Sequence, residues 1–238
     1  MNSTDMKAPI LLSLLLTVPS AWGDIYLNEI RFDQPGADND EYFEIFSTDP
    51  ANDSLADVAL IVLGDGTGGS GIVESVTSLA GSAFTTSYFL VAESGFTLGT
   101  PDLVVALNFE NSDNVTCAVV RGFTGLSGDD LDTNDDGILD STPWTALLDG
   151  VSLTTGIAYP DGDHTYVQLG PMIGPDGAIA PGHIYRSLDG GAWQIGRFDP
   201  DGGDDTPGAA NPSAIPEPSS HALLALGLGA LLLRRPRR

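Results

Sequence analysis

Cysteine is almost absent from this 238-residue sequence, which contains one residue of that type, Cys117. An intramolecular disulfide is therefore excluded, and stability has to come from packing, with metal binding as a further source. Cys117 lies within the apolar run 115–120. We expect an inert thiol in the core there rather than a nucleophile.

Basic residues are nearly as scarce between the two ends of the chain. Of nine Lys and Arg, only four arginines fall within residues 24–215, whereas all but two of the 33 Asp and Glu fall there. A body with this charge repels phosphate backbones, which argues against direct binding of nucleic acid. Divalent cations are its natural partners.

The same region lacks any sustained apolar spacing at i, i+3, i+4 and i+7, so long amphipathic helices are not expected. It contains short β-branched or aromatic runs that clusters of Gly, Pro, Asn and Asp separate. The predicted strands are residues 25–32, 42–46, 58–63, 72–79, 88–92, 103–109, 115–120, 146–153, 166–169, 183–186 and 193–195. Many short strands with short links predict an all-β sandwich or barrel in which antiparallel pairing dominates.

The second of these runs, Tyr42 to Phe46, alternates apolar and acidic residues. We expect Phe43 and Ile45 in the core, with Glu41 and Glu44 solvated. In the first run, Asn28 and Glu29 lie next to Arg31, and they form either a buried polar corner or an exposed edge.

The N-terminal end has the composition of a secretory signal peptide. Lys7 precedes an apolar run over residues 10–18, and Ala21 and Gly23 are small residues at the −3 and −1 positions before Asp24. We expect cleavage between Gly23 and Asp24. Translation from Met6 would remove Asp5, an unusual residue in such a leader.

The C-terminal end combines three features in order: Pro216-Glu217-Pro218, an uncharged run over residues 219–233, and a basic end with Arg234, Arg235, Arg237 and Arg238. As a helix the run would span roughly 22 Å, short of a hydrocarbon core about 30 Å thick. The arginines favour a cytoplasmic C-terminus. A buried helix at the end of a soluble protein is the alternative interpretation.

This order resembles the PEP-CTERM sorting tail of exported bacterial proteins. The resemblance implies a transient inner-membrane anchor, a short transmembrane helix over 219–233, and processing by an exosortase-like enzyme. The product is then expected at the cell surface or in the extracellular space.

The body resembles a second family, the lamin tail domain. The resemblance rests on Ile25-Tyr26-Leu27-Asn28-Glu29-Ile30, on Glu41-Tyr42-Phe43-Glu44-Ile45-Phe46, and on segments 109–116, 129–144 and 206–211. It implies an immunoglobulin-like antiparallel β-sandwich over residues 24–211, followed by a linker over 212–218, and a binding or scaffolding role without catalytic residues. Leu55-Ala56-Asp57 departs from the Leu-Ser-Gly turn that the family pattern leads us to expect.

The acidic segment 129–140, which we expect as a loop inserted in the sandwich, is the best candidate for a chemical site. From residue 132 it reads D-x-N-x-D-G-x-x-D, so hard oxygen ligands recur at the spacing of a calcium loop. The predicted ligands are Asp132, Asn134, Asp136, the carbonyl group of Ile138, and Asp140, with Gly137 at the sharp turn and Asp130 or Asp149 completing the shell. Pro143 at position 12 excludes an EF-hand, and the pattern is closer to the calcium loops of dockerins and thrombospondin type 3 repeats. A solvated acidic loop without metal is the alternative.

Catalytic motifs are weak. Residues 64–69 fit G-x-G-x-x-G, but a strand-like segment follows, so we expect a hairpin loop rather than a dinucleotide site. His164 and His183 lack the spacing of a metal pair, and we expect polar residues at strand ends. The sequence therefore favours a non-catalytic structural or adhesive protein of the surface or of a polysaccharide matrix. A metal-dependent phosphoesterase, or a secreted protein associated with nucleases, is the competing hypothesis.

Overall fold

The computed structural model describes residues 24–107, 109–110 and 113–213. These residues form strands and connecting loops, and the described part of the chain contains no helix. The strands are β1 (Ile25–Arg31), β2 (Tyr42–Ser47), β3 (Val58–Gly66), β4 (Gly69–Ser78), β5 (Tyr88–Ala92), β6 (Leu103–Val104), β7 (Val115–Arg121), β8 (Ala146–Leu153), β9 (Met172–Ile173), β10 (His183–Arg186) and β11 (Trp193–Ile195).

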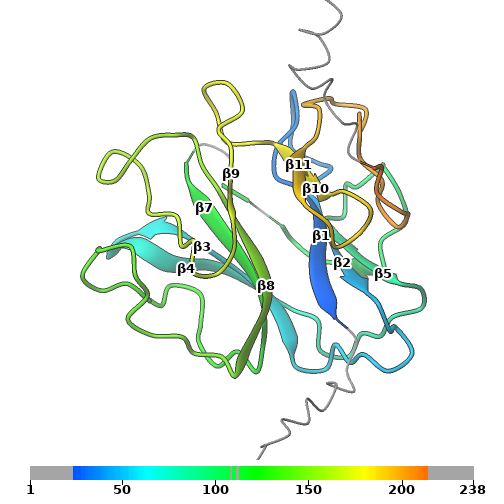
Figure 1. Cartoon of the computed structure of the whole chain (residues 1–238), viewed down its shortest axis with the longest axis horizontal. Coiled ribbons are helices and arrows are strands. Elements are labelled where there is room, and N and C mark those ends of the chain that lie inside the picture. The colour runs from blue at the N-terminus through cyan, green and yellow to red at the C-terminus, as the bar shows by residue number, and fades with distance from the viewer. Residues whose placement is uncertain (1–23, 108, 111–112, 214–238) are drawn as a thin grey trace, which may run out of the picture.

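The strands make two sheets that face each other (Figure 1). The first has the order β11-β10-β1-β2-β5-β6 and the second the order β4-β3-β7-β8-β9. Most neighbours are antiparallel, but β5 pairs with β6 and β8 with β9 in parallel. The all-β sandwich that the sequence predicts is therefore confirmed in outline, while the purely antiparallel sheet is corrected at two edges.

The main core lies between the two sheets. Strand β1 shows which of its side chains face this core. Ile25 and Leu27 point into this core, and so does Ile30, three positions further on. The register of β1 against β2 shifts between Leu27 and Glu29. Such a bulge moves the alternation by one residue. Glu29 and the residue two positions beyond it, Arg31, consequently leave the main core and face the outer side of the sheet.

The outer side of the second sheet carries a second buried cluster. Ile61 and Leu63 of β3 pack there, whereas Leu60 and Val62 belong to the main core. Leu131 of the acidic segment and Tyr166 of the loop after β8 complete the cover. Both faces of β3 are thus buried, which is why its sequence is continuously apolar rather than alternating.

Nine of the eleven predicted strands coincide with observed strands to within a few residues at each end. In the region predicted as a strand over 103–109, the structure shows only the two-residue β6. The strand predicted over 166–169 is wrong: Tyr166 and Leu169 are buried, but they lie in a turn, and the strand of this region is β9. Tyr166 contacts the acidic loop, so its burial comes from the outer cluster and not from a sheet.

Three further predictions are confirmed. Cys117 is a free, buried thiol in β7, and burial raises its pKa well above the usual range. Residues 64–69 form the tip of the β3–β4 hairpin, with no helix following them. Phe43 and Ile45 are fully buried as expected. The structure describes no helix long and apolar enough to cross a bilayer in residues 24–213, and the predicted segment 219–233 lies outside the described residues.

The double burial of β3 leads to a specific expectation for stability. Leu60→Ala and Ile61→Ala should each lower the free energy of unfolding by about 2–5 kcal/mol, because both side chains are enclosed, on opposite faces of the strand. Val104→Ala, at a side chain that is 55% exposed, serves as the control and should change little. Urea denaturation of the three variants measures this. An Ile61 effect as small as the Val104 effect would mean that the loops do not cover the outer face.

Candidate functional site

The acidic segment 129–140 is fastened along the edge strand β4. The amide group of Val73 donates to the carbonyl oxygen of Asp129 at 2.9 Å, and the amide group of Leu131 donates to that of Gly71 at 3.0 Å. Ile72 and Asp130 form an isolated antiparallel bridge. The segment therefore satisfies part of the exposed edge of the second sheet, which would otherwise invite pairing with another chain.

Asp132 is the buried centre of this segment. Its side chain is completely enclosed, and its Oδ2 accepts hydrogen bonds from the amide group of Gly137 at 2.9 Å and from the hydroxyl group of Tyr166 at 3.0 Å. Gly137 has φ +81°, the left-handed region in which glycine is favoured. The sharp turn that the sequence predicts at Gly137 is confirmed.

The other predicted ligands lie on the exposed rim of the loop. The amide group of Asp136 donates to Asn134 Oδ1 at 3.1 Å, and Asp136 Oδ1 accepts from the amide group of Ile138 at 2.9 Å. Asp140 Oδ2 accepts from the amide and hydroxyl groups of Thr133. The side-chain oxygens are thus bonded to the loop's own amide and hydroxyl groups, which fixes the shape of the loop.

Of the two residues proposed to complete the shell, one lies near the loop and one does not. Asp130 Oδ1 accepts from the amide group of Asp132 at 3.1 Å. Asp149 is engaged elsewhere: it forms an ion pair with Arg186 at 2.7 Å and accepts from the amide group of Leu27 at 3.0 Å. Of the two alternatives, Asp149 is therefore excluded, because in β8 its side chain faces Arg186 and the backbone of β1 rather than the loop.

The two histidines have different surroundings. His164 lies in a loop next to the acidic segment, where its ring stacks on Tyr159 at 4.1 Å between centroids and its Nε2 lies 2.9 Å from the carbonyl oxygen of Asp135. His183 opens β10 and is buried. Only His183 matches the expectation of a strand end.

Three groups of carboxylate and imidazole side chains converge elsewhere in the described residues. Within each group, one potential ligand atom per residue lies within 4.8 Å of the others. The groups are Glu29, His183 and Asp205; Asp65, Asp113 and Asp163; and Asp65, Glu74 and Glu110. The sequence did not single out any of them, because each gathers residues from distant segments.

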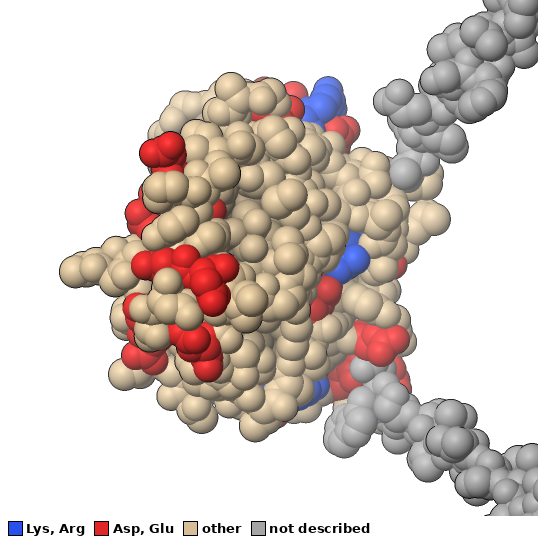
Figure 2. Space-filling view, turned by 60° about the vertical axis from the view of Figure 1, so that its left-hand side comes forward, with Lys and Arg blue, Asp and Glu red and all other residues tan. Residues whose placement is uncertain are grey.

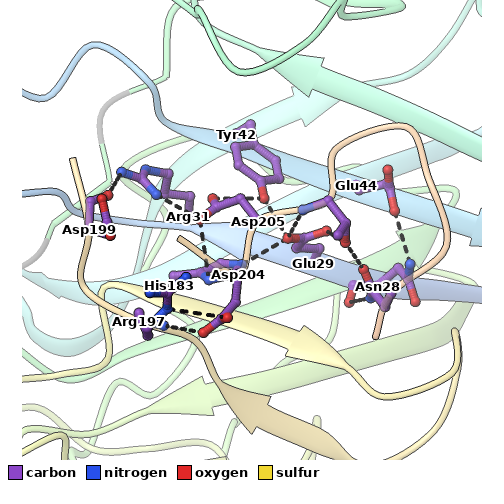
Figure 3. A network of polar contacts seen from close by, with 12 residues as sticks. Asn28, Glu29, Arg31, Tyr42, Glu44, His183, Arg197, Asp199, Asp204 and Asp205 are labelled. Atoms are coloured by element: carbon purple, nitrogen blue, oxygen red, sulfur yellow. Dashed lines mark hydrogen bonds and ion pairs between the residues drawn. The ribbon is translucent and has the colours of Figure 1, made fainter. Parts of the chain in front are cut away.

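The first group belongs to a buried polar network on the outer side of the first sheet (Figure 3). Glu29 Oε1 accepts hydrogen bonds from Tyr42 at 2.6 Å, from His183 Nε2 at 2.8 Å and from the amide group of Thr206 at 2.9 Å. Its Oε2 accepts from the hydroxyl group of Thr206 at 3.1 Å. Of the two alternatives for Asn28 and Glu29, the buried polar corner is the correct one.

Asp205 joins the same network from the segment that follows β11. It forms an ion pair with Arg31 at 2.8 Å, and both side chains are only 1% exposed. Tyr42 lies 3.0 Å from Asp205, and His183 Nδ1 lies 3.5 Å from it. Burial raises the pKa of Asp205, although His183 and Arg31 oppose this rise. Because every oxygen of Glu29 is already bonded and a guanidinium group lies against Asp205, the arrangement is a structural lock rather than a metal centre.

Glu44 was predicted to be solvated, and the structure shows that this prediction is wrong. It is fully buried and accepts from Asn28 Nδ2 at 2.9 Å and from the amide group of Gly208 at 2.6 Å. Burial raises its pKa to about 8. Glu41 is also buried, and burial raises its pKa to about 7. Both were expected in solvent, and the expectation failed because the loops and the segment that follows β11 cover this face.

The termini of the body are described in part. Asp24, the expected first residue after cleavage, is exposed and its side chain accepts from Tyr26 at 3.0 Å. The remaining predicted signal and sorting residues lie outside the described residues. Acidic side chains gather in patches on the face that Figure 2 shows, with few basic atoms among them.

Comparison with known proteins identifies the C-terminal end. Residues 214–238 match the PEP-CTERM protein-sorting motif. The match supports export of the chain through an exosortase-type sorting system and delivery to the cell surface. No curated protein and no solved structure matches the chain.

Two neighbouring aspartates test the structural lock. Asp205→Asn removes one partner of a buried ion pair and should lower the free energy of unfolding by about 3–5 kcal/mol. Asp204→Asn breaks an ion pair with Arg197 whose side chains are 35% and 65% exposed, and it should cost less than about 1 kcal/mol. Guanidinium unfolding measures both values. Equal effects would contradict a lock centred on Glu29 and Asp205.

Proposed function

We propose that this chain is an exported, non-catalytic structural or adhesive protein that is held briefly in the inner membrane by its C-terminal end. The observation that carries the proposal is the match of residues 214–238 to the PEP-CTERM motif. An exosortase-like enzyme would process the tail. The body would then remain at the surface or within an extracellular polysaccharide matrix.

The finer part of the proposal is that the body is a lamin-tail-type sandwich with immunoglobulin-like packing. Two observations support it. The two segments that carry the resemblance, 25–30 and 41–46, become the adjacent strands β1 and β2. Segment 206–211, which also carries it, contacts Glu29 and Glu44 of these strands.

We also propose that the acidic loop binds calcium through Asp132, Asn134, Asp136, the carbonyl oxygen of Ile138, and Asp140. In its favour are the turn at Gly137, the enclosed carboxylate of Asp132 and the exposed rim of oxygen ligands. These are the ligand types that Ca²⁺ prefers, at the spacing of known calcium loops.

Replacing Pro216, Glu217 and Pro218 by alanine in the native host tests the sorting. Because this triplet lies within the matched motif, close to its start, we expect most of the unprocessed chain to collect in the membrane fraction. The unaltered chain should instead yield a shortened product at the surface or with extracellular polysaccharide. Immunoblots of the fractions measure this, and Asp176→Ala in an exposed loop is the control.

Two results would contradict the proposed role. One is normal processing and delivery of the triplet variant. The other is metal-dependent hydrolysis of phosphodiesters by the purified chain that Asp136→Ala abolishes, which would favour the phosphoesterase hypothesis.

Calcium binding by the loop should appear as a shift in thermal stability. With free Ca²⁺ at about a hundred times the dissociation constant, stabilisation of about 2.7 kcal/mol corresponds to a rise in Tm of about 5–10 °C. Asp136→Ala removes a rim ligand while leaving Asp132 in place, and it should abolish the part of the rise that the loop contributes. Calorimetry in EDTA and in Ca²⁺ measures the difference. If Ca²⁺ does not change the Tm of the unaltered chain, the site is refuted.

A further inference from the structure

A hollow of about 510 Å³ lies where three parts of the chain meet. Its walls come from the acidic loop, from the segment that follows β8, and from β9 with the turn after it. The volume falls within the range of about 300–1,000 Å³ that is usual for small-molecule sites. Apart from Asp136 and Ile138, which belong to the acidic loop, none of the proposed calcium ligands is near it in sequence, so the hollow is a separate feature of the surface.

Large apolar side chains that are exposed to solvent gather in this hollow. Ile157 is 48% exposed, Tyr159 is 40% exposed and Met172 is 52% exposed, and all three line it. Exposed apolar groups that converge in a concave surface are typical of a contact with another molecule. The ring of Tyr159 stacks on the ring of His164, with 4.1 Å between the centroids and 18° between the planes. The hollow therefore has an aromatic wall.

The aromatic wall is held in place by Asn114, whose side chain is buried. Its Oδ1 accepts hydrogen bonds from the amide group of Thr155 at 2.7 Å and from the hydroxyl group of the same residue at 3.1 Å. Its Nδ2 donates to the carbonyl oxygens of Ile157 at 2.8 Å and of Asp163 at 2.7 Å. One side chain thus fixes both ends of segment 155–163. A wall that is already ordered costs less conformational entropy when a ligand binds.

His164 offers a hydrogen-bond acceptor beside this wall. Its Nε2 lies 2.9 Å from the carbonyl oxygen of Asp135, and because a carbonyl group can only accept, Nε2 carries the proton. In the neutral ring Nδ1 is then an acceptor, and no hydrogen bond joins it to another described residue. A Cβ atom at Gly137 would lie 3.1 Å from Nδ1, so the glycine leaves space next to this nitrogen. Both residues line the hollow.

The charges around the hollow favour a ligand that donates hydrogen bonds and carries no negative charge. Asp136 and Asp163 also line it, and ionised carboxylates can only accept. No lysine or arginine is among its lining residues, and the four arginines of the described part of the chain are paired elsewhere, with Asp205, Asp57, Asp149 and Asp204. A phosphate, sulfate or carboxylate group on a ligand would therefore be repelled without a counter-ion.

We propose that this hollow binds a pyranose unit of a glycan that carries no negative charge. One face of a pyranose ring consists of C–H groups, which pack on the electron-rich face of an aromatic ring such as Tyr159. The edge of the ring carries hydroxyl groups that donate to Asp163 and to Nδ1 of His164. An apolar ligand would leave these acceptors unused, and an anion would be repelled. The inference rests on the proposed role in a polysaccharide matrix, and it names the site through which the body binds that matrix.

Isothermal titration of the purified chain with β-1,4-linked hexamers of glucose, of glucosamine and of mannuronic acid tests the proposal. The buffer contains Ca²⁺, so the result does not depend on whether the acidic loop requires the ion. We expect the glucose and glucosamine hexamers to bind and the mannuronic acid hexamer not to bind, because its carboxylates meet the acidic lining. Binding of the glucosamine hexamer without the glucose hexamer would assign the hollow to amino sugars.

Variants of exposed side chains locate the binding. Tyr159→Ala removes the aromatic wall and should weaken binding by about tenfold, whereas Tyr159→Phe keeps the ring and should bind as the unaltered chain does. Phe198→Ala is the matched control, because Phe198 is also 40% exposed but lies outside the hollow. Met172→Ala, in the edge strand β9, removes another apolar contact of the same hollow, and it should weaken binding by about threefold even if Tyr159→Ala fails to fold.

Three results would overturn the proposal: no binding of any hexamer, tighter binding of the mannuronic acid hexamer than of the other two, or binding that Tyr159→Ala and Met172→Ala leave unchanged. The last of these would mean attraction to the acidic surface in general. None of the three bears on the sorting of the chain, which the triplet variant tests by itself. Normal processing of that variant would contradict the proposed role and would leave the binding of the hexamers as it is.

Discussion

The burial of Glu29 is the constraint on which the arrangement of the body depends. Its two oxygens accept four hydrogen bonds from β2, β10 and the segment after β11. A carboxylate at this depth is tolerated only when every lone pair has a donor, so these three segments have to arrive together. The last stretch of the body is therefore held over the first sheet by polar groups, and Asp205 and Arg31 reinforce it with a buried ion pair. The sorting segment begins a few residues later.

The outer face of the second sheet is covered by a different kind of contact. Its cover is apolar in the middle, where Leu131 and Tyr166 pack on β3, and acidic at the rim. Asp132 connects the apolar middle of this cover with its acidic rim, because its side chain is buried and accepts a hydrogen bond from Tyr166. Both sheets are thus enclosed on both sides. This gives a chain with a single cysteine enough buried surface to fold without a disulfide.

The sequence predicts the positions of the strands better than it predicts the burial and the contact partners of individual side chains. Strands such as 88–92 and 146–153 are recognised because their apolar, β-branched pattern is local. The two-residue strand β9 has no local pattern and exists only through its pairing with β8. Glu44 was assigned to solvent because alternation cannot reveal that Gly208, far along the chain, covers it. In the candidate loop, the turn at Gly137 follows from the sequence, whereas the diversion of Asp149 to Arg186 depends on tertiary packing.

The stability of the acidic body depends on pH. Carboxyl groups whose pKa values burial raises to about 7 and 8 make the body less stable as pH rises to neutrality, and no arginine of the described residues relieves them. The calcium binding that we propose for the acidic loop would oppose this loss of stability, because an ion that binds only the folded state stabilises it. Extracellular calcium modules function with dissociation constants of about 10⁻⁴–10⁻³ M. Calcium binding in this range, as proposed for the loop, would therefore stabilise the body at the cell surface, to which the sorting motif directs the chain.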